Sequence, residues 1–157
     1  MILHFTNPWD QLEVGKEINL LAKEWHERVE FLDLQIKDNN WNKNSWKDLW
    51  NHFLNKEICL LCESGLVVGF CLINHFFEEN SIHLWKIVID TKHRMRGLGG
   101  KLLEFQIKKY PGKTIYLEVA ADNIMAIRFY ESLAFKKVHF AKGFYSNGKD
   151  AWKMTRT

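Results

Sequence analysis

A basic, glycine-rich loop is the stretch of the sequence whose residue types most directly suggest chemistry. It follows the apolar run 84–89 and precedes leucines at helical spacing, so it joins a predicted strand to a predicted helix. Such a turn leaves backbone N–H groups without intrahelical partners, and the helix dipole adds positive potential there. Lys101 and the arginines of the loop add formal charge. The loop therefore predicts a site for a pyrophosphate-like anion. Its residues are Arg94, Met95, Arg96, Gly97, Leu98, Gly99 and Gly100.

Leu102 excludes two common phosphate-binding motifs. The nucleotide-hydrolysing loop needs Ser or Thr after Gly-Lys to hold magnesium, but Gly100-Lys101 is followed by leucine. The dinucleotide fingerprint needs a third glycine three residues after Gly99, and that position is again Leu102. The pattern that remains is Arg-x-x-Gly-x-Gly after a hydrophobic strand.

A second candidate for chemistry is Glu118, in the predicted strand 114–119. Alternation places Ile115, Leu117 and Val119 on one face and Thr114, Tyr116 and Glu118 on the other. Burying a charged carboxylate in the middle of a strand costs free energy, unless the group has a role in the reaction or is paired with a cation. Two interpretations stay open at this point. Glu118 is a reactive group, or it belongs to an edge strand or a salt bridge with a lysine.

The elements that must position these residues follow from periodicity and turn signals. Ser64-Gly65 predicts a hairpin turn, Asn147-Gly148 another, and Asp122-Asn123 a helix cap. A capping box at Ser45 predicts the start of an aromatic helix. Strands are predicted over 2–5, 58–63, 66–74, 84–89, 114–119, 136–140 and 151–154, and helices over 14–29, 45–54, 98–107 and 123–133.

Composition bounds the class of protein. With 157 residues, 46% of them hydrophobic, the chain is expected to form one globular domain over 1–157. A net charge of +3, without a stripe of basic residues and interleaved aromatics, argues against nucleic-acid binding. No apolar window is long enough for a membrane span, and the first residues lack a signal-peptide pattern. Three cysteines without an even framework suggest a reducing, cytoplasmic location.

No metal site is expected from the sequence. Cys59 and Cys62 lie three residues apart in a predicted strand, so their side chains point to opposite faces and cannot share a metal ion. The seven histidines are scattered along the chain.

Two segments together resemble the GCN5-related N-acetyltransferase (GNAT) superfamily. The glycine loop is similar to its Gln/Arg-x-x-Gly-x-Gly/Ala motif, which binds the pyrophosphate of acetyl-CoA. The block 117–135, with Asn123, Tyr130 and Phe135, is similar to the family's Leu-Glu-Val…Asn…Ala-Ile…Tyr-Glu-Ser-Leu-Gly-Phe pattern, although Ala134 replaces its glycine. The resemblance covers about 86–154 and is greatest to ribosomal-protein-alanine N-acetyltransferases. It implies an α/β fold with a central mixed, mostly antiparallel sheet of six to seven strands and helices on both faces.

The resemblance also implies roles for individual residues. Acetyl-CoA would be the co-substrate, with Glu118 as the base that deprotonates an amine through water, and Tyr130 as the acid that protonates the departing sulfur. Asn123 would hydrogen-bond the pantetheine. The remaining cofactor contacts would come from the backbone of Ile87, Val88 and Ile89 and from the loop of Arg94, Met95, Arg96, Gly97, Leu98, Gly99 and Gly100.

The acceptor is less closely defined by the sequence. Tyr145 matches a tyrosine that contacts peptide backbone in the resembling enzymes, which favours a protein or peptide N-terminal amine. Trp41 and its aromatic neighbours either pack in the core or line a substrate groove between the first helices and the sheet. However, Gly143-Phe144 replaces the usual Asn-Tyr. A small amine, such as a polyamine, amino acid or antibiotic, is the main alternative. A non-catalytic CoA-binding module is disfavoured because Glu118 and Tyr130 are both present. Monomer and homodimer both remain open.

Overall fold

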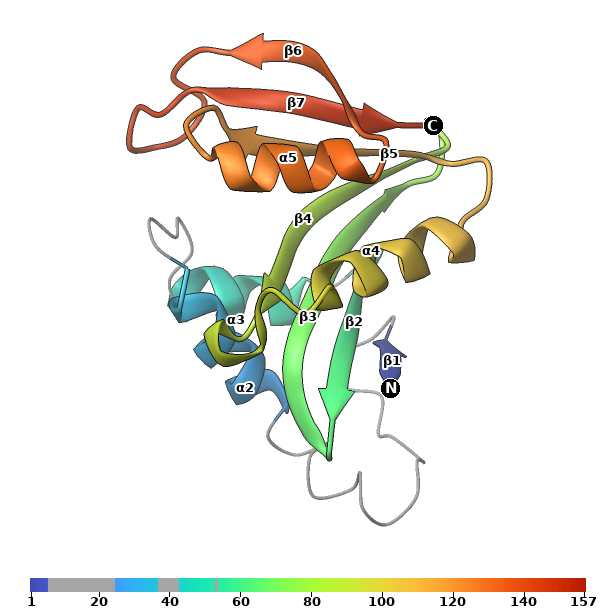
Figure 1. The fold of residues 1–157 in the computed structure, drawn as a ribbon, viewed down its shortest axis with the longest axis vertical. Coiled ribbons are helices and arrows are strands. Elements are labelled where there is room, and N and C mark those ends of the chain that lie inside the picture. The colour runs from blue at the N-terminus through green and yellow to red at the C-terminus, as the bar shows by residue number, and fades with distance from the viewer. Residues whose placement is uncertain (6–24, 37–42, 53) are drawn as a thin grey trace.

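A single seven-stranded sheet organises the protein (Figure 1). The computed structural model describes residues 1–5, 25–36, 43–52 and 54–157. The strand order is β1-β2-β3-β4-β5-β7-β6. Neighbouring strands are antiparallel except β4 and β5, which are parallel. The predicted mixed, mostly antiparallel sheet is therefore confirmed. The elements are β1 (Ile2–Phe5), α2 (Trp25–Leu34), α3 (Lys43–Asn51), β2 (Lys56–Glu63), β3 (Leu66–Phe76), β4 (Ser81–Ile89), the 3-10 turn η1 (Thr91–His93), α4 (Leu98–Lys109), β5 (Thr114–Ala120), α5 (Ile124–Ser132), β6 (Lys136–Ala141) and β7 (Ala151–Arg156).

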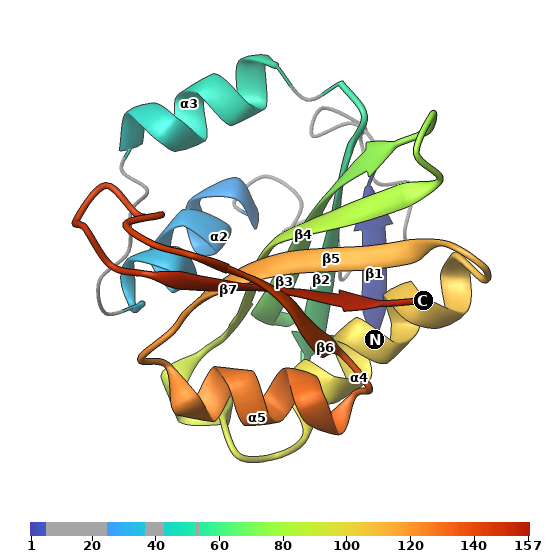
Figure 2. The ribbon, with the colours of Figure 1, turned by 90° about the horizontal axis from the view of Figure 1, so that it is seen from above.

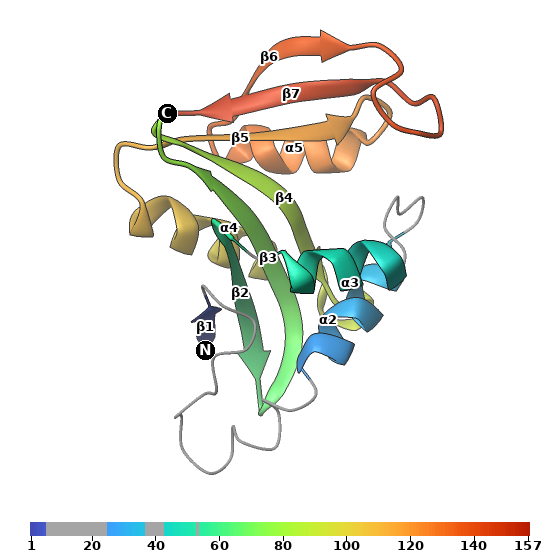
Figure 3. The same cartoon turned by 180° about the vertical axis from the view of Figure 1, so that it is seen from behind.

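Helices cover both faces of the sheet, as predicted. Seen from above, α4 and α5 lie on one side of the strands and α2 and α3 on the other (Figure 2). The view from behind brings α2 and α3 to the front (Figure 3). Each layer has its own apolar core: Leu102 and Ile127 belong to the first, and Trp25 and Phe70 to the second.

The burial of each strand follows from these layers. Strands β2 and β3 are buried along almost every residue because both of their faces are covered, which explains their continuous apolar sequences. In β5, burial alternates residue by residue, so only the face of Ile115, Leu117 and Val119 meets the core beneath α4 and α5. The face that carries Tyr116 and Glu118 is more open.

The two parallel strands part soon after they begin. Strands β4 and β5 are paired only from Ser81 to His83 on one strand and from Thr114 to Tyr116 on the other. Beyond these residues β4 curves away from β5 (Figures 1 and 3). The backbone of the second half of β4 therefore has no sheet partner on the β5 side.

A bulge at Trp85 changes which residues of β4 face each layer. Leu72 pairs with Lys86 and Ile73 with Leu84, which leaves Trp85 as the extra residue. Before the bulge, Leu84 belongs to the core beneath α4 and α5; after it, Ile87 packs against that same core. The sequence carries no signal that predicts this shift.

Several predicted boundaries need correction. Helix α3 begins at Lys43, so Ser45 lies within its first turn and is not its N-cap. Helix α2 continues to Leu34, past the predicted end at Val29, whereas positions 14–24 of the predicted helix lie outside the described residues. The hairpin turn at Ser64-Gly65 is confirmed: both residues have positive φ, as a two-residue turn of the I′ type requires.

Candidate active site

The glycine loop forms a tight, open turn at the start of α4. Gly97 is the N-cap residue, with φ of 71°, and Met95 has φ of 61° and is 91% exposed. A Cβ placed on Gly97 or Gly100 would meet no heavy atom within 4 Å. The first N–H groups of α4 therefore face a side of the loop that a bulky anion can approach.

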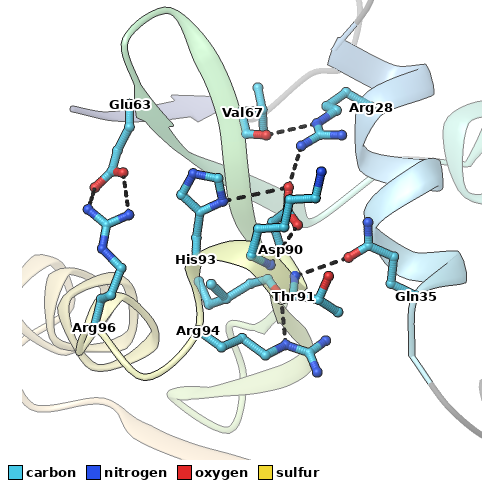
Figure 4. A network of polar contacts seen from close by, with 11 residues as sticks. Arg28, Gln35, Glu63, Val67, Asp90, Thr91, His93, Arg94 and Arg96 are labelled. Atoms are coloured by element: carbon cyan, nitrogen blue, oxygen red, sulfur yellow. Dashed lines mark hydrogen bonds and ion pairs between the residues drawn. The ribbon is translucent and has the colours of Figure 1, made fainter.

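Asp90, at the end of β4, connects the segment before the loop to α2 (Figure 4). The sequence analysis did not predict this contact. Asp90 Oδ2 lies 2.6 Å from Arg28 Nη2, and Asp90 Oδ1 accepts a hydrogen bond from the Lys92 backbone N–H at 3.1 Å. The Gln35 side chain, in the turn directly after α2, accepts from the Thr91 N–H at 3.1 Å. Burial alone would raise the pKa of Asp90, but the Lys92 N–H and the Arg28 guanidinium outweigh it and lower that pKa.

The two arginines of the loop have different surroundings. Arg96 makes a two-pronged contact with Glu63, at 2.9 and 3.2 Å, so its guanidinium is engaged with the β2–β3 turn. The Arg94 side chain donates from Nε to the Ile89 carbonyl at 3.0 Å and makes no ion pair within the described residues. Of the predicted loop cations, Arg94 and Lys101 are therefore the ones left to attract an anion, while Arg96 contributes chiefly its backbone.

The backbone of β4 presents alternate residues to the gap beside β5. The Asp90 N–H donates to the Val68 carbonyl on β3 at 2.8 Å. Because successive residues of a strand point their N–H and C=O groups to opposite edges, the groups of Ile89 and Ile87 face away from β3. The bond from Arg94 to the Ile89 carbonyl agrees with this direction. Of the three residues predicted to bind the pantetheine arm, Ile87 and Ile89 face the gap, and the backbone of Val88 faces β3.

Glu118 stands on the open face of β5 and contacts a histidine. Its Oε2 atom lies 2.6 Å from His83 Nε2, across the point where β4 and β5 part. Trp85 donates from Nε1 to His83 Nδ1 at 2.8 Å. The structural alternatives weighed from the sequence are wrong: β5 lies between β4 and β7, and the ion-pair partner found for Glu118 in the described part of the chain is His83.

The end of α5 fixes Tyr130 through a Schellman motif. The Phe135 N–H donates to the Tyr130 carbonyl at 3.1 Å and the Ala134 N–H to the Glu131 carbonyl at 3.0 Å. The Phe135 ring packs edge-on against the Tyr130 ring, with centroids 5.7 Å apart. Ala134, which replaces the glycine of the resembling family, has φ of 65°.

Burial and neighbouring ionisable groups raise the pKa of both Tyr130 and Tyr145. Burial, then the Cys71 thiol and the Tyr145 hydroxyl, raise the pKa of Tyr130. Burial, then the Glu118 carboxylate and Asp122, raise the pKa of Tyr145. A tyrosine with a raised pKa keeps its proton at neutral pH, which is the state a general acid needs.

The other predicted contacts have mixed outcomes. Asn123 caps α5, as predicted: its Oδ1 accepts from the Ala126 N–H at 3.1 Å, and the residue is exposed. Trp41 lies outside the described residues.

Among the residues that the structure describes, no group of three or more His, Cys, Asp or Glu side chains is placed to hold a metal ion. No helix in the described ranges has the length and apolar character to cross a membrane.

Comparison with known proteins identifies the family. Residues 17–135 match the model of the Acetyltransferase (GNAT) family. The chain is 41% identical over 78 residues to an N-alpha-acetyltransferase of Saccharolobus solfataricus, covering 47% of each chain. It is 30% identical over 111 residues to the N-alpha-acetyltransferase RimI of Mycobacterium tuberculosis, covering 68% of this chain and 66% of that one. The matches therefore span about half to two thirds of these curated relatives.

Solved structures share the fold over nearly the whole chain. Ard1 from Thermoplasma volcanium superposes with a TM-score of 0.72 at 22% identity, covering 99% of this chain and 95% of that one. The ribosomal-protein-S18-alanine N-acetyltransferase of Escherichia coli gives 0.69 at 24% identity, covering 99% and 92%. Because the family model matches well over half of the sequence, and the fold agrees, this chain belongs to the GNAT acetyltransferase family.

Proposed function

We propose that this protein transfers the acetyl group of acetyl-CoA to a primary amine, and that the amine is the N-terminal α-amine of a protein or peptide. The observation that carries the proposal is that Glu118 lies on the open face of β5, at the point where β5 parts from β4, the strand that leads into the glycine loop at the start of α4. The N-alpha-acetyltransferase names of the sequence relatives support the same reaction and acceptor.

The residues present suit acetyl-CoA. The open loop and the first N–H groups of α4 would hold the pyrophosphate, with Arg94 and Lys101 adding charge. The backbone of Ile87 and Ile89 would hold the pantetheine arm, and the exposed residue Asn123 would hydrogen-bond it. Bound acetyl-CoA supplies an activated acetyl thioester.

Two side chains of this protein would accept and donate the protons that the reaction moves. An α-ammonium group, with a pKa of about 8, must lose a proton before its nitrogen can attack a carbonyl, and the Glu118 carboxylate would accept it directly or through water. A second proton leaves the nitrogen as the amide forms. The Tyr130 hydroxyl would donate a proton to the departing sulfur and recover one from solvent, so the net release is one proton.

Tyr145 would contact the acceptor peptide. It lies in the β6–β7 connection, where its backbone N–H donates to the Lys149 carbonyl at 3.0 Å and its carbonyl accepts from the Gly148 N–H at 2.8 Å. These bonds fix the turn that carries Tyr145, and the Glu118 carboxylate acts on its hydroxyl by raising the pKa of Tyr145. We also propose that residues 1–157 act as one acetyltransferase domain in the cytoplasm, which the three free cysteines support.

Release of free thiol from acetyl-CoA tests the acceptor class. Three acceptors are compared: a peptide with a free N-terminus, the same peptide blocked at its N-terminus but carrying an internal lysine, and spermidine. Turnover confined to the free N-terminus is expected. Turnover with spermidine alone would replace the peptide with a small amine. Tight CoA binding with no turnover on any acceptor would reject the catalytic proposal.

A further inference from the structure

Trp85, His83 and Glu118 form a directional chain of hydrogen bonds at the candidate active site. The Trp85 indole contacts His83 Nδ1 at 2.8 Å, and His83 Nε2 contacts Glu118 Oε2 at 2.6 Å. The His83 side chain is 22% exposed and that of Glu118 16%, so water competes weakly for either contact.

The indole decides which nitrogen of His83 carries the proton. Tryptophan Nε1–H can only donate, so His83 Nδ1 must be an unprotonated acceptor. The single proton of the neutral imidazole is then on Nε2, where it is donated to Glu118 Oε2. The chain therefore runs in one direction, from the indole to the carboxylate, and leaves Glu118 Oε1 for another partner.

The backbone explains why these three residues can meet. His83 is the last residue of β4 that is paired with β5, opposite Tyr116. Glu118 lies two residues further along β5, and Trp85 is the bulged residue two positions further along β4. His83 thus bridges the two strands at the point where they part. The Tyr116 ring stacks on the imidazole, with centroids 4.5 Å apart and planes 10° apart, and holds it in that position.

Other ionisable groups lie near this chain of hydrogen bonds. Lys153 pairs with Glu118 across the β5–β7 ladder and places its ammonium over the Tyr116 ring at 4.4 Å. The Lys56 ammonium lies 5.4 Å from the centroid of Trp85. After burial, Glu118 and then Glu79 raise the pKa of Tyr116, and Glu118 and then Asp122 raise the pKa of Tyr145, so these groups also act on this part of the site.

We propose that His83 is a positioning residue for the reaction, and that Trp85 fixes it as the neutral Nε2–H tautomer. The hydrogen bond from His83 holds one oxygen of Glu118 and stabilises its ionised form, so the carboxylate presents Oε1 to the acceptor amine. This inference rests on the proposed function, in which Glu118 is the base. His83 itself neither gains nor loses a proton during the reaction.

The first test needs no substrate. In protein labelled with ¹⁵N at histidine, the ring-nitrogen spectrum at pH 7 should show His83 protonated on Nε2 and unprotonated on Nδ1. In Trp85→Phe the Nδ1 atom loses its donor, so the spectrum of His83 should no longer be confined to the Nε2–H tautomer. A His83 protonated on Nδ1 in the parent protein would overturn the inference.

The second test compares kcat/KM of each variant with that of the parent from pH 5.5 to pH 9, using one peptide. The ionisation of the peptide cancels in this ratio. His83→Ala removes a hydrogen bond to an ionised group, so its ratio should fall by about threefold between pH 8 and pH 5.5. His83→Gln keeps a donor and should restore a flat ratio. His139→Ala, which removes an exposed histidine on β6, is the matched control.

The two tests separate this inference from the proposed function. A pH-independent loss in His83→Ala that His83→Gln does not rescue would mean that the histidine only supports the fold, and would overturn the inference. If the parent acetylates no peptide, the proposed acceptor fails, and the ring-nitrogen spectrum alone decides whether the hydrogen-bond chain exists. Full activity in Glu118→Gln would reject the base itself, and with it the positioning role.

Discussion

Arg28 Nη2 on α2 lies 2.6 Å from Asp90 Oδ2 at the end of β4, although the two residues are 62 positions apart in the chain. The same guanidinium donates from Nε to the Val67 carbonyl on β3 at 2.9 Å. This contact joins α2 to the end of β4, from which the chain runs through η1 into the glycine loop (Figure 4). Helices α2 and α4 lie on opposite faces of the sheet (Figure 2). The position of the loop therefore depends on α2.

Arg28→Ala is expected to weaken both the fold and the loop. It leaves the largely buried Asp90 carboxylate without its guanidinium partner, so the free energy of unfolding should fall by about 2–3 kcal/mol. Acetyl-CoA binding should weaken by several-fold because Asp90 and Thr91 are less firmly held. Urea unfolding and calorimetric titration measure the two effects. Arg128→Ala, an exposed arginine on α5, should change stability by less than about 0.5 kcal/mol. Equal losses in both variants would contradict the prediction.

The lowered pKa of Asp90 gives a pH dependence of stability with a definite sign. A carboxyl group whose pKa is lower in the folded state stabilises the protein above its unfolded pKa of about 3.9, and this contribution is lost as the pH falls through the folded value. The parent should therefore lose stability relative to Asp90→Asn below about pH 4. Urea midpoints at pH 7, 5, 4 and 3 measure this difference. A difference that does not change with pH would show that the ion pair does not account for the shift.

Tyr130→Phe should separate catalysis from binding. Loss of the proton donor is expected to lower turnover by about 10-fold or more while the Kd for acetyl-CoA stays unchanged. Tyr110→Phe is the matched control, because the Tyr110 hydroxyl hydrogen-bonds buried Glu57 far along α4. This control should reduce stability and leave turnover per folded molecule intact. Unchanged turnover in Tyr130→Phe would remove the acid from the mechanism.

Ala134→Gly should stabilise the protein. Ala134 holds φ of 65°, a left-handed conformation that is strained for any residue with a Cβ, at the position of the Schellman motif where glycine is usual. Relief of this strain, less the greater flexibility of glycine in the unfolded chain, should raise the free energy of unfolding by about 0.5–1 kcal/mol. Thermal unfolding measures the gain. Ala126→Gly, inside α5, should have the opposite effect by about 1 kcal/mol, and a loss in both variants would refute the prediction.

The sequence predicts the features that depend on neighbouring residues. The alternation of β5 identifies its two faces because each residue's face is set by its position in one strand. The glycine loop and the cap at Asn123 are equally local, since a turn and a helix start are determined within a few residues.

The features that the sequence does not predict join residues from distant elements. Buried Glu57 on β2 contacts His75 on β3 and both Lys109 and Tyr110 at the end of α4, and no local pattern indicates that these groups meet. His83 is one scattered histidine among seven until the pairing of β4 with β5 and the bulge at Trp85 bring it to Glu118. Registry between strands, which supplies these contacts, is a property of the assembled sheet.

Because of the bulge at Trp85, the number of residues in β4 determines which layer each of its side chains faces. One extra residue lets Leu84 and Ile87 contact the same layer although they are three positions apart, and lets His83 and Lys86 share the opposite one. Deleting a single residue between them would turn the apolar side chains of Ile87 and Ile89 toward α2 and the Lys86 ammonium into the apolar layer beneath α4. Homologous sequences are therefore expected to tolerate substitutions along β4 more readily than insertions or deletions.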